Sequence, residues 1–222
     1  MGWKAACVFV CETDEPFLAG YPTHDGDGAK EIVERIGLAE EFEFAETRTL
    51  DIGMYPAHGD LYVGAYPGGA ALCRWELLEP LLDRPDSEDT RTFVSAFPEA
   101  RILVLSLHSV TDYAAWALYQ DGECLRLRAS ADGEVIQDFG DPLPEELPLW
   151  ERAIERGGEL TWIEEIAGEE YDLDEVAMGE EFVFELGRRV CGCRLDEYDV
   201  WALSMDQYYR PRRSLLSRLL GR

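Results

Sequence analysis

The chain alternates between short apolar segments and polar breaks that are rich in glycine and proline. Residues 4–11 form an apolar run of strong β-formers closed by an acidic stretch, which predicts a buried strand. Apolar side chains within residues 32–36 follow helical spacing, and Gly37 predicts the end of that helix. Residues 60–67 predict a second strand, and residues 71–78 a third strand or a passage from strand to helix.

The clearest pattern lies between residues 101 and 140. Residues 102–107 and 113–120 are apolar and predict two strands, residues 123–129 alternate between apolar and polar side chains, and residues 135–139 predict a fourth strand. An Asp-Gly pair, the preferred sequence of a two-residue hairpin turn, separates the second strand from the third and the third from the fourth. Such a turn joins only antiparallel strands, so this region predicts an antiparallel meander at the centre of the sheet.

The C-terminal third carries weaker signals. Residues 149–156 predict a short helix, residues 179–190 a helix with one apolar face, and residues 200–208 a late strand. No internal repeat is present. The sequence therefore predicts a single α+β domain over residues 1–209, with a mainly antiparallel sheet, a central meander and helices packed on it, followed by a basic tail at 210–222.

Composition narrows the class of protein. Of 222 residues, 46% are hydrophobic, which is enough for a proper core and excludes wholesale disorder. No apolar stretch is long enough for a membrane span, and the N-terminus lacks the pattern of a cleavable signal, so we expect a soluble cytoplasmic protein. The six cysteines are expected to be reduced thiols, because a chain with this much apolar material does not need disulfides.

The charge is strongly negative. The 46 acidic residues outnumber the 20 basic ones, which gives a net charge of -26. Such a body repels phosphates and anionic lipids, so neither nucleic acid nor a membrane is expected as a partner. Two explanations of the acidity remain open: general solubility or salt adaptation, and a specific basic protein partner.

The tail reverses that charge, since residues 210–222 contain five arginines and no acid. Its four leucines recur at i, i+1, i+4 and i+5 and would share one face of a helix. A helix this short needs a surface to dock on, and the alternatives are the acidic body of the chain itself, a partner or second copy, and an anionic membrane. The docking residues expected in the tail are Arg212, Arg213, Leu215, Leu216, Leu219 and Leu220.

Each of the three histidines has an aspartate close downstream. The pairs are His24 with Asp25, His58 with Asp60, and His108 with Asp112. If these loops converged, His24, His58 and His108 could ligate a divalent metal, or His58, Asp60, His108 and Asp112 could form a catalytic acid-base set. In a chain this acidic, a nearby aspartate is close to expected, so structural or surface histidines are the alternative. No cofactor is expected, because the sequence holds no phosphate-binding glycine loop, dinucleotide fingerprint, nucleophile elbow or zinc ribbon.

Scattered motifs across the chain resemble an actinobacterial family that carries only a domain-of-unknown-function label. They are Met1-Gly2-x-Lys4, Tyr66-Pro67-Gly68, His108-Ser109-Val110-x-Asp112 followed by Trp116, Asp121-Gly122, Gly140-Asp141-Pro142-Leu143-Pro144 and Gly179-Glu180-Glu181. The chain departs from the family at Cys7 and Cys11, where plain aliphatic residues are usual, and its basic tail has no counterpart there. The resemblance implies a shared fold and a cytoplasmic bacterial setting, with no known activity.

Two functional hypotheses follow. The first is a non-enzymatic interaction or inhibitory module, similar to an immunity protein, that binds a basic protein partner or self-associates through its tail. The alternative is a small hydrolase-type enzyme, with or without a metal, that uses the His58, Asp60, His108 and Asp112 set. The sequence leaves open whether the chain is an enzyme.

Overall fold

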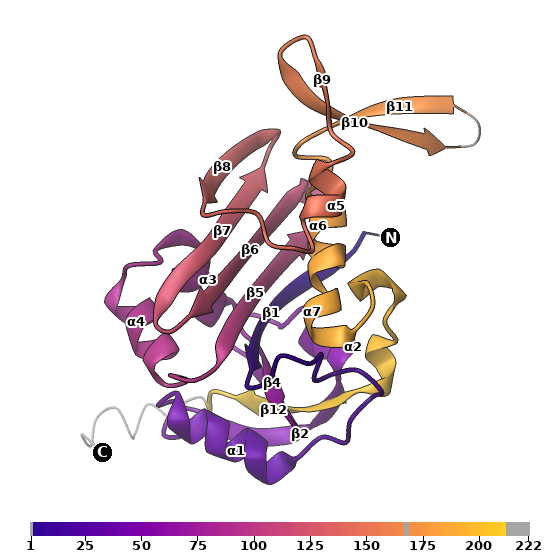
Figure 1. Cartoon of the computed structure of the whole chain (residues 1–222). Coiled ribbons are helices and arrows are strands. Elements are labelled where there is room, and N and C mark those ends of the chain that lie inside the picture. Colours follow the sequence, from indigo (N-terminus) through magenta and orange to yellow (C-terminus); the bar gives the residue numbers. More distant parts are fainter. Residues whose placement is uncertain (1, 167–168, 212–222) are drawn as a thin grey trace.

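The computed structural model describes residues 2–166 and 169–211, with helices packed on a large antiparallel sheet and a smaller sheet projecting from it (Figure 1). The strands are β1 (Lys4–Cys11), β2 (Glu43–Thr49), β3 (Leu61–Tyr66), β4 (Gly69–Cys73), β5 (Arg101–His108), β6 (Tyr113–Gln120), β7 (Glu123–Ala131), β8 (Glu134–Phe139), β9 (Ile154–Arg156), β10 (Glu159–Ile166), β11 (Glu169–Asp174) and β12 (Ser204–Tyr209). The helices are α1 (Gly26–Arg35), α2 (Leu50–Gly53), α3 (Trp75–Asp83), α4 (Glu88–Ser95), α5 (Leu147–Trp150), α6 (Gly179–Leu186) and α7 (Arg188–Cys191).

The large sheet has nine strands in the order β2-β12-β3-β4-β1-β5-β6-β7-β8. Every neighbouring pair runs antiparallel. β1 occupies the middle, between β4 and β5. The late strand β12 inserts between β2 and β3, so residues from both ends of the described chain belong to the same sheet.

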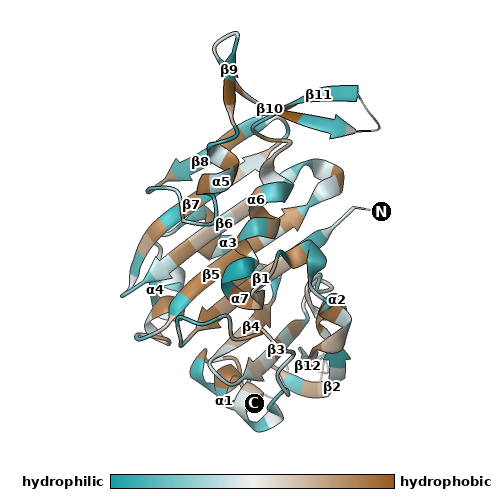
Figure 2. Ribbon diagram, turned by 45° about the vertical axis from the view of Figure 1, so that its right-hand side comes forward, coloured by the Kyte–Doolittle hydropathy of each residue, from teal (hydrophilic) through white to brown (hydrophobic). Residues whose placement is uncertain are grey.

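Helices cover both faces of this sheet, because the side chains of β1 alternate between two apolar cores. Cys7 and Phe9 face a core completed by α6 and α7, whereas Val8 and Val10 face a second core formed with α1, α3 and α4. This arrangement explains why residues 4–11 read as an uninterrupted apolar run: the strand is buried on both faces. Figure 2 shows the same concentration of hydrophobic residues on the middle strands.

Asp-Gly turns join the last three strands of the meander, as the sequence predicts. Asp121 and Gly122 have φ values of 52° and 83°, and Asp132 and Gly133 have values of 52° and 80°. Positive φ at both central residues is what the tightest hairpin turn requires, and Asp-Gly tolerates it well. The hairpins β6-β7 and β7-β8 follow directly.

The small sheet β9–β11 is fastened to the body at its base, mainly through Trp162 of β10. This side chain is fully buried, and its Nε1 donates to the Leu149 carbonyl at 2.7 Å. Its ring lies 5.5 Å from that of Trp150 and 6.3 Å from that of Phe182 on α6. Most other side chains of β9–β11 are exposed. The small sheet is therefore attached to the body through its aromatic contacts, and the rest of it is exposed to solvent.

The α+β fold class and the mainly antiparallel sheet are confirmed, while several details differ from the expectation. The meander β5–β8 begins beside the middle strand β1 and runs to the edge strand β8, so it forms one half of the sheet. The helix expected at 149–156 ends with α5, and β9 begins within that range. No helix among residues 2–166 and 169–211 is long and apolar enough to cross a membrane.

Candidate functional site

His24 lies between β3 and β12 and does not pair with its neighbour Asp25. Its Nδ1 is 3.3 Å from the backbone N and O of Ala65, and its Nε2 is 3.2 Å from Asp206 Oδ1, although that N–H is not aligned as a hydrogen bond. The Asp25 carboxylate instead accepts the first N–H groups of α1, at 3.1 and 3.2 Å, as a helix cap. The partner of His24 is therefore a residue far away in the sequence.

The other two histidine pairs remain separate. His58 is exposed, and Asp60 accepts a hydrogen bond of 2.9 Å from Gln207. The Nδ1 of His108 is 3.0 Å from the hydroxyl of Thr111, within the turn that follows β5.

Asp112 ends that turn with φ of 48°, and the His108 ring lies 6.0 Å from the ring of Tyr55. No contact in the described part of the chain joins the three histidines to one another. Within the same residues, no group of three or more His, Cys, Asp or Glu side chains is placed to hold a metal ion. The geometry thus gives no support to a shared metal or catalytic cluster.

The tail residues expected to dock on a surface lie outside the described part of the chain. They are Arg212, Arg213, Leu215, Leu216, Leu219 and Leu220. Just before them, Arg210 forms an ion pair with Glu41 and places its guanidinium 5.4 Å from the ring centre of Phe42. The last described residues therefore run beside the loop that precedes β2.

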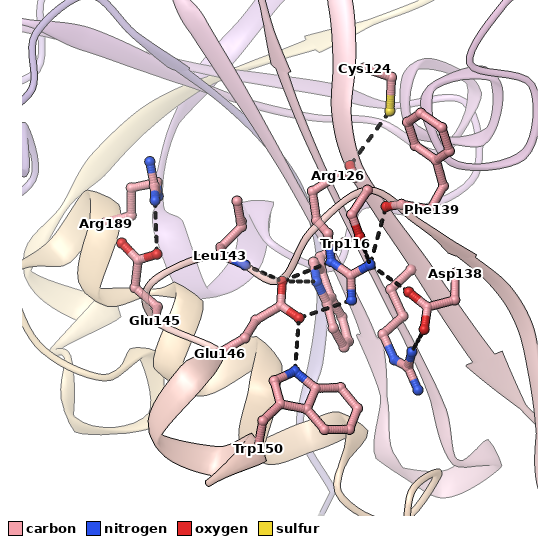
Figure 3. Close-up of polar contacts among 12 residues, drawn as sticks. Trp116, Cys124, Arg126, Asp138, Phe139, Leu143, Glu145, Glu146, Trp150 and Arg189 are labelled. Atoms are coloured by element: carbon pink, nitrogen blue, oxygen red, sulfur yellow. Dashed lines mark hydrogen bonds and ion pairs between the residues drawn. The ribbon is translucent and has the colours of Figure 1, made fainter.

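The densest group of buried polar side chains centres on Glu146, which is fully buried (Figure 3). Its carboxylate accepts hydrogen bonds from Trp116 Nε1, Arg126 Nε and Nη2, the backbone N–H of Leu143 and Trp150 Nε1, at 3.0 to 3.3 Å. Five donors on one carboxylate fill its lone pairs. Glu146 thus has no hydrogen-bonding position left for a substrate.

Two buried arginines on β7 extend this network. Arg126 also donates to Asp138 and to the carbonyl oxygens of Phe139 and Gly140, the latter two at 3.1 and 3.0 Å. Arg128 pairs with Asp138 and Glu175. Burial would lower the pKa of Arg126, but the hydrogen bonds that Arg126 donates to Glu146 and Asp138 outweigh burial and hold that pKa above its usual value. Every nitrogen of the Arg126 guanidinium thus has a partner.

The network connects to both stems of the small sheet. Glu146 and Trp150 lie in the segment that leads into β9, and Glu175 directly follows β11. The guanidinium of Arg128 also lies 5.1 Å from the ring centre of Trp150. We therefore assign the network a supporting role: β7 fixes the entry and the exit of the projecting sheet.

The small sheet itself is strongly acidic. Residues 154–174 contain eight acidic side chains and one arginine. Glu165 and Glu170 are directly opposite each other on β10 and β11, and Asp172 and Asp174 continue along the same face. Arg156 forms an ion pair of 2.6 Å with Asp172. Opposed like charges destabilise a strand pair, so folding alone gives no reason to place them here.

The opposite face of the small sheet carries exposed apolar side chains. Leu160 and Tyr171 share the face of Trp162 but lie beyond its buried base, and they are 43% and 44% exposed. Figure 2 shows how hydrophilic β10 and β11 are beside the hydrophobic middle of the large sheet. Exposed apolar side chains of this kind can contribute to a contact with another protein.

Comparison with known proteins identifies a family. The model of a family of unknown function (DUF6928) matches residues 5–191. The chain belongs to DUF6928. Neither a curated protein nor a solved structure matches it. The expectation of a domain-of-unknown-function family is confirmed, and the actinobacterial origin stays a prediction.

The DUF6928 match extends from β1 to α7, so it includes the small sheet and the Glu146 network and leaves out β12. Sequence reasoning missed both features. The alternation in β7 is the ordinary sign of a strand with one exposed face, and it gave no hint that Arg126 and Arg128 are buried. The run of acids at 164–174 is the signal in the sequence that points to this surface.

Proposed function

We propose that this DUF6928 protein is a non-enzymatic interaction module that binds a basic protein partner through β9–β11. The observation that carries the proposal is the acidic face of the small sheet, where Glu165 opposes Glu170 and two aspartates extend the row. A basic surface placed against this face would relieve the repulsion between these carboxylates. Binding would therefore recover free energy that the folded chain alone does not.

Three further features support a docking role. The sheet projects from the body, so a partner can reach it without contacting the large sheet (Figure 1). Its base is fixed by Trp162 and by the Arg126 and Arg128 contacts, which lowers the ordering cost on binding. The net charge of -26 steers a basic partner toward the molecule.

A protein that covers a basic surface of its partner can inhibit that partner. We therefore propose an inhibitory, immunity-like role in a bacterial cytoplasm. The enzyme hypothesis has no comparable observation behind it. His58 and His108, its central residues, have separate local partners or none among the described contacts.

The test is capture of a partner from native lysate with untagged protein at low and at high salt. We expect a basic protein to be recovered at low salt and released at high salt. The variant Glu165→Gln/Glu170→Gln should lose it, whereas the control Glu40→Gln/Glu99→Gln, which removes the same number of exposed charges elsewhere, should retain it. No partner at any salt, or equal loss in both variants, would count against a docking face on β9–β11.

A further inference from the structure

A groove of about 260 Å³ lies between α1 and the strands β2 and β12. Its walls are mostly apolar and aromatic, and one buried carboxylate contributes to its lining. The residues that define it are Gly26, Val33, Phe42, Phe44, Asp206 and Tyr208. Lys30 and Glu34 of α1 also line it, and their opposite charges offset each other. Both of these side chains are exposed, so Asp206 is the buried charged side chain of the lining.

Asp206 is only 5% exposed, and its two carboxylate oxygens differ. Oδ1 accepts a hydrogen bond of 2.9 Å from Thr47 and lies 3.2 Å from His24 Nε2. Oδ2 receives no hydrogen bond from any described residue. A Cβ on Gly26 would stand 3.3 Å from this oxygen, so the missing side chain at Gly26 leaves room beside it. Because Asp206 lines the groove, this oxygen can accept the N–H groups of a ligand that lies there.

The aromatic walls suit a positive charge. Phe44 is 55% exposed, and its ring meets that of Tyr208 edge-on with centroids 6.0 Å apart. At the rim, the Phe42 ring already has two guanidinium groups beside it, those of Arg74 at 4.6 Å and Arg210 at 5.4 Å. Aromatic faces attract cations through their quadrupole, and the attraction strengthens where water is excluded.

We propose that this groove binds a small organic cation, a primary ammonium or guanidinium group on an apolar stem. The cationic N–H groups donate to Asp206 Oδ2, and the stem lies against Phe44 and Tyr208. The volume of about 260 Å³ lies just below the usual range of small-molecule pockets, so it suits a small ligand. The cation belongs either to a free amine or to an arginine or lysine side chain. The groove lies at α1 and β12, so this proposal is tested independently of the proposed docking face on β9–β11.

The test is a titration of the full chain with phenethylammonium and with butylguanidinium, followed by the backbone amide resonances of α1 and β12. Both cations should shift these resonances saturably, and the uncharged phenethyl alcohol should not. Asp206→Asn should weaken binding about tenfold or more, which corresponds to about 1.4 kcal/mol. Phe44→Ala should also weaken it and is safe for folding, because Phe44 is largely exposed. Trp201→Ala, which removes another exposed aromatic ring, should leave binding unchanged.

A second arm identifies the source of the cation by repeating the titration on a chain that ends at Pro211. Equal binding by both chains supports a site for free amines. Binding only by the shortened chain supports the same site filled by arginines of the tail. Binding by neither chain would overturn the proposal, as would binding that neither Asp206→Asn nor Phe44→Ala weakens.

Discussion

Replacing Glu146 with glutamine tests the supporting role of the buried network. The substitution keeps the shape of the side chain but removes the charge that faces Arg126 and turns one acceptor into a donor. At least one of the N–H groups now bonded to the carboxylate then loses its partner, and the guanidinium of Arg126 stays buried with only Asp138 at the rim to balance it.

The size of the effect follows from burial. Glu146 and Arg126 are 0% and 1% exposed, so solvent cannot compensate the lost contact. Removing one member of a buried ion pair costs about 3–5 kcal/mol. In a chain of this size each kcal/mol lowers the melting temperature by about 2–4 °C, so we expect a decrease of about 10 °C.

The assay is urea unfolding followed by circular dichroism, with hydrogen exchange as a local readout. The midpoint should fall with little change in slope, and the amides of β9–β11 should exchange faster than those of β1 and β5. Glu145→Gln is the matched control. Glu145 pairs with Arg189 at 2.8 Å but stays 19% exposed, and its loss should cost about 1 kcal/mol. If Glu146→Gln costs no more than Glu145→Gln, the network does not support the small sheet.

Three further outcomes are expected. Gly140→Ala should lower the free energy of unfolding by about 3 kcal/mol or more, because a Cβ there would lie 1.9 Å from the Leu125 carbonyl oxygen. Gly122→Ala, at a position with the same sign of φ and open space around it, should lower it by about 1 kcal/mol. Thermal melts that rank the two variants equally would refute this. Burial raises the pKa of the Cys11 thiol to about 11. The stability that comes from the neutral thiol is therefore complete below about pH 9 and is lost as the pH rises through 11. Urea unfolding across this pH range should show a smaller decrease in the free energy of unfolding for Cys11→Ala than for the unaltered protein. Deleting residues 210–222 should leave a folded, soluble domain with altered association, checked by circular dichroism and sedimentation, and unfolding of the shortened chain would place the tail in the core.

The parts of the fold that the sequence could predict are those where one physical pattern dominates. Residues 4–11 are apolar on both faces, and the Asp-Gly turns permit only antiparallel partners, so β1 and the strand pairs β6-β7 and β7-β8 were predictable. β2 and β11 are polar and exposed along most of their length. Their strand conformation comes from pairing with β12 and β10, and such long-range pairing leaves little trace in local periodicity.

The candidate sites were less predictable for the same reason. Proximity in sequence suggested that His24 pairs with Asp25, yet Asp25 caps α1 and the carboxylate near His24 belongs to Asp206 on the last strand. Glu165 and Glu170 could be read as acids, but their direct opposition depends on the register of β10 and β11. Composition indicates what charge a chain carries, and strand register determines where that charge is concentrated.

Hydrogen exchange on the complex with a captured basic partner tests the central claim most directly. Binding through the acidic face should slow exchange at the amides of β10 and β11 and leave α1 and the strands of the large sheet unchanged. The protection should disappear at high salt and in Glu165→Gln/Glu170→Gln. Protection on α1 or the large sheet, with β10 and β11 exchanging as in the free protein, would contradict the account.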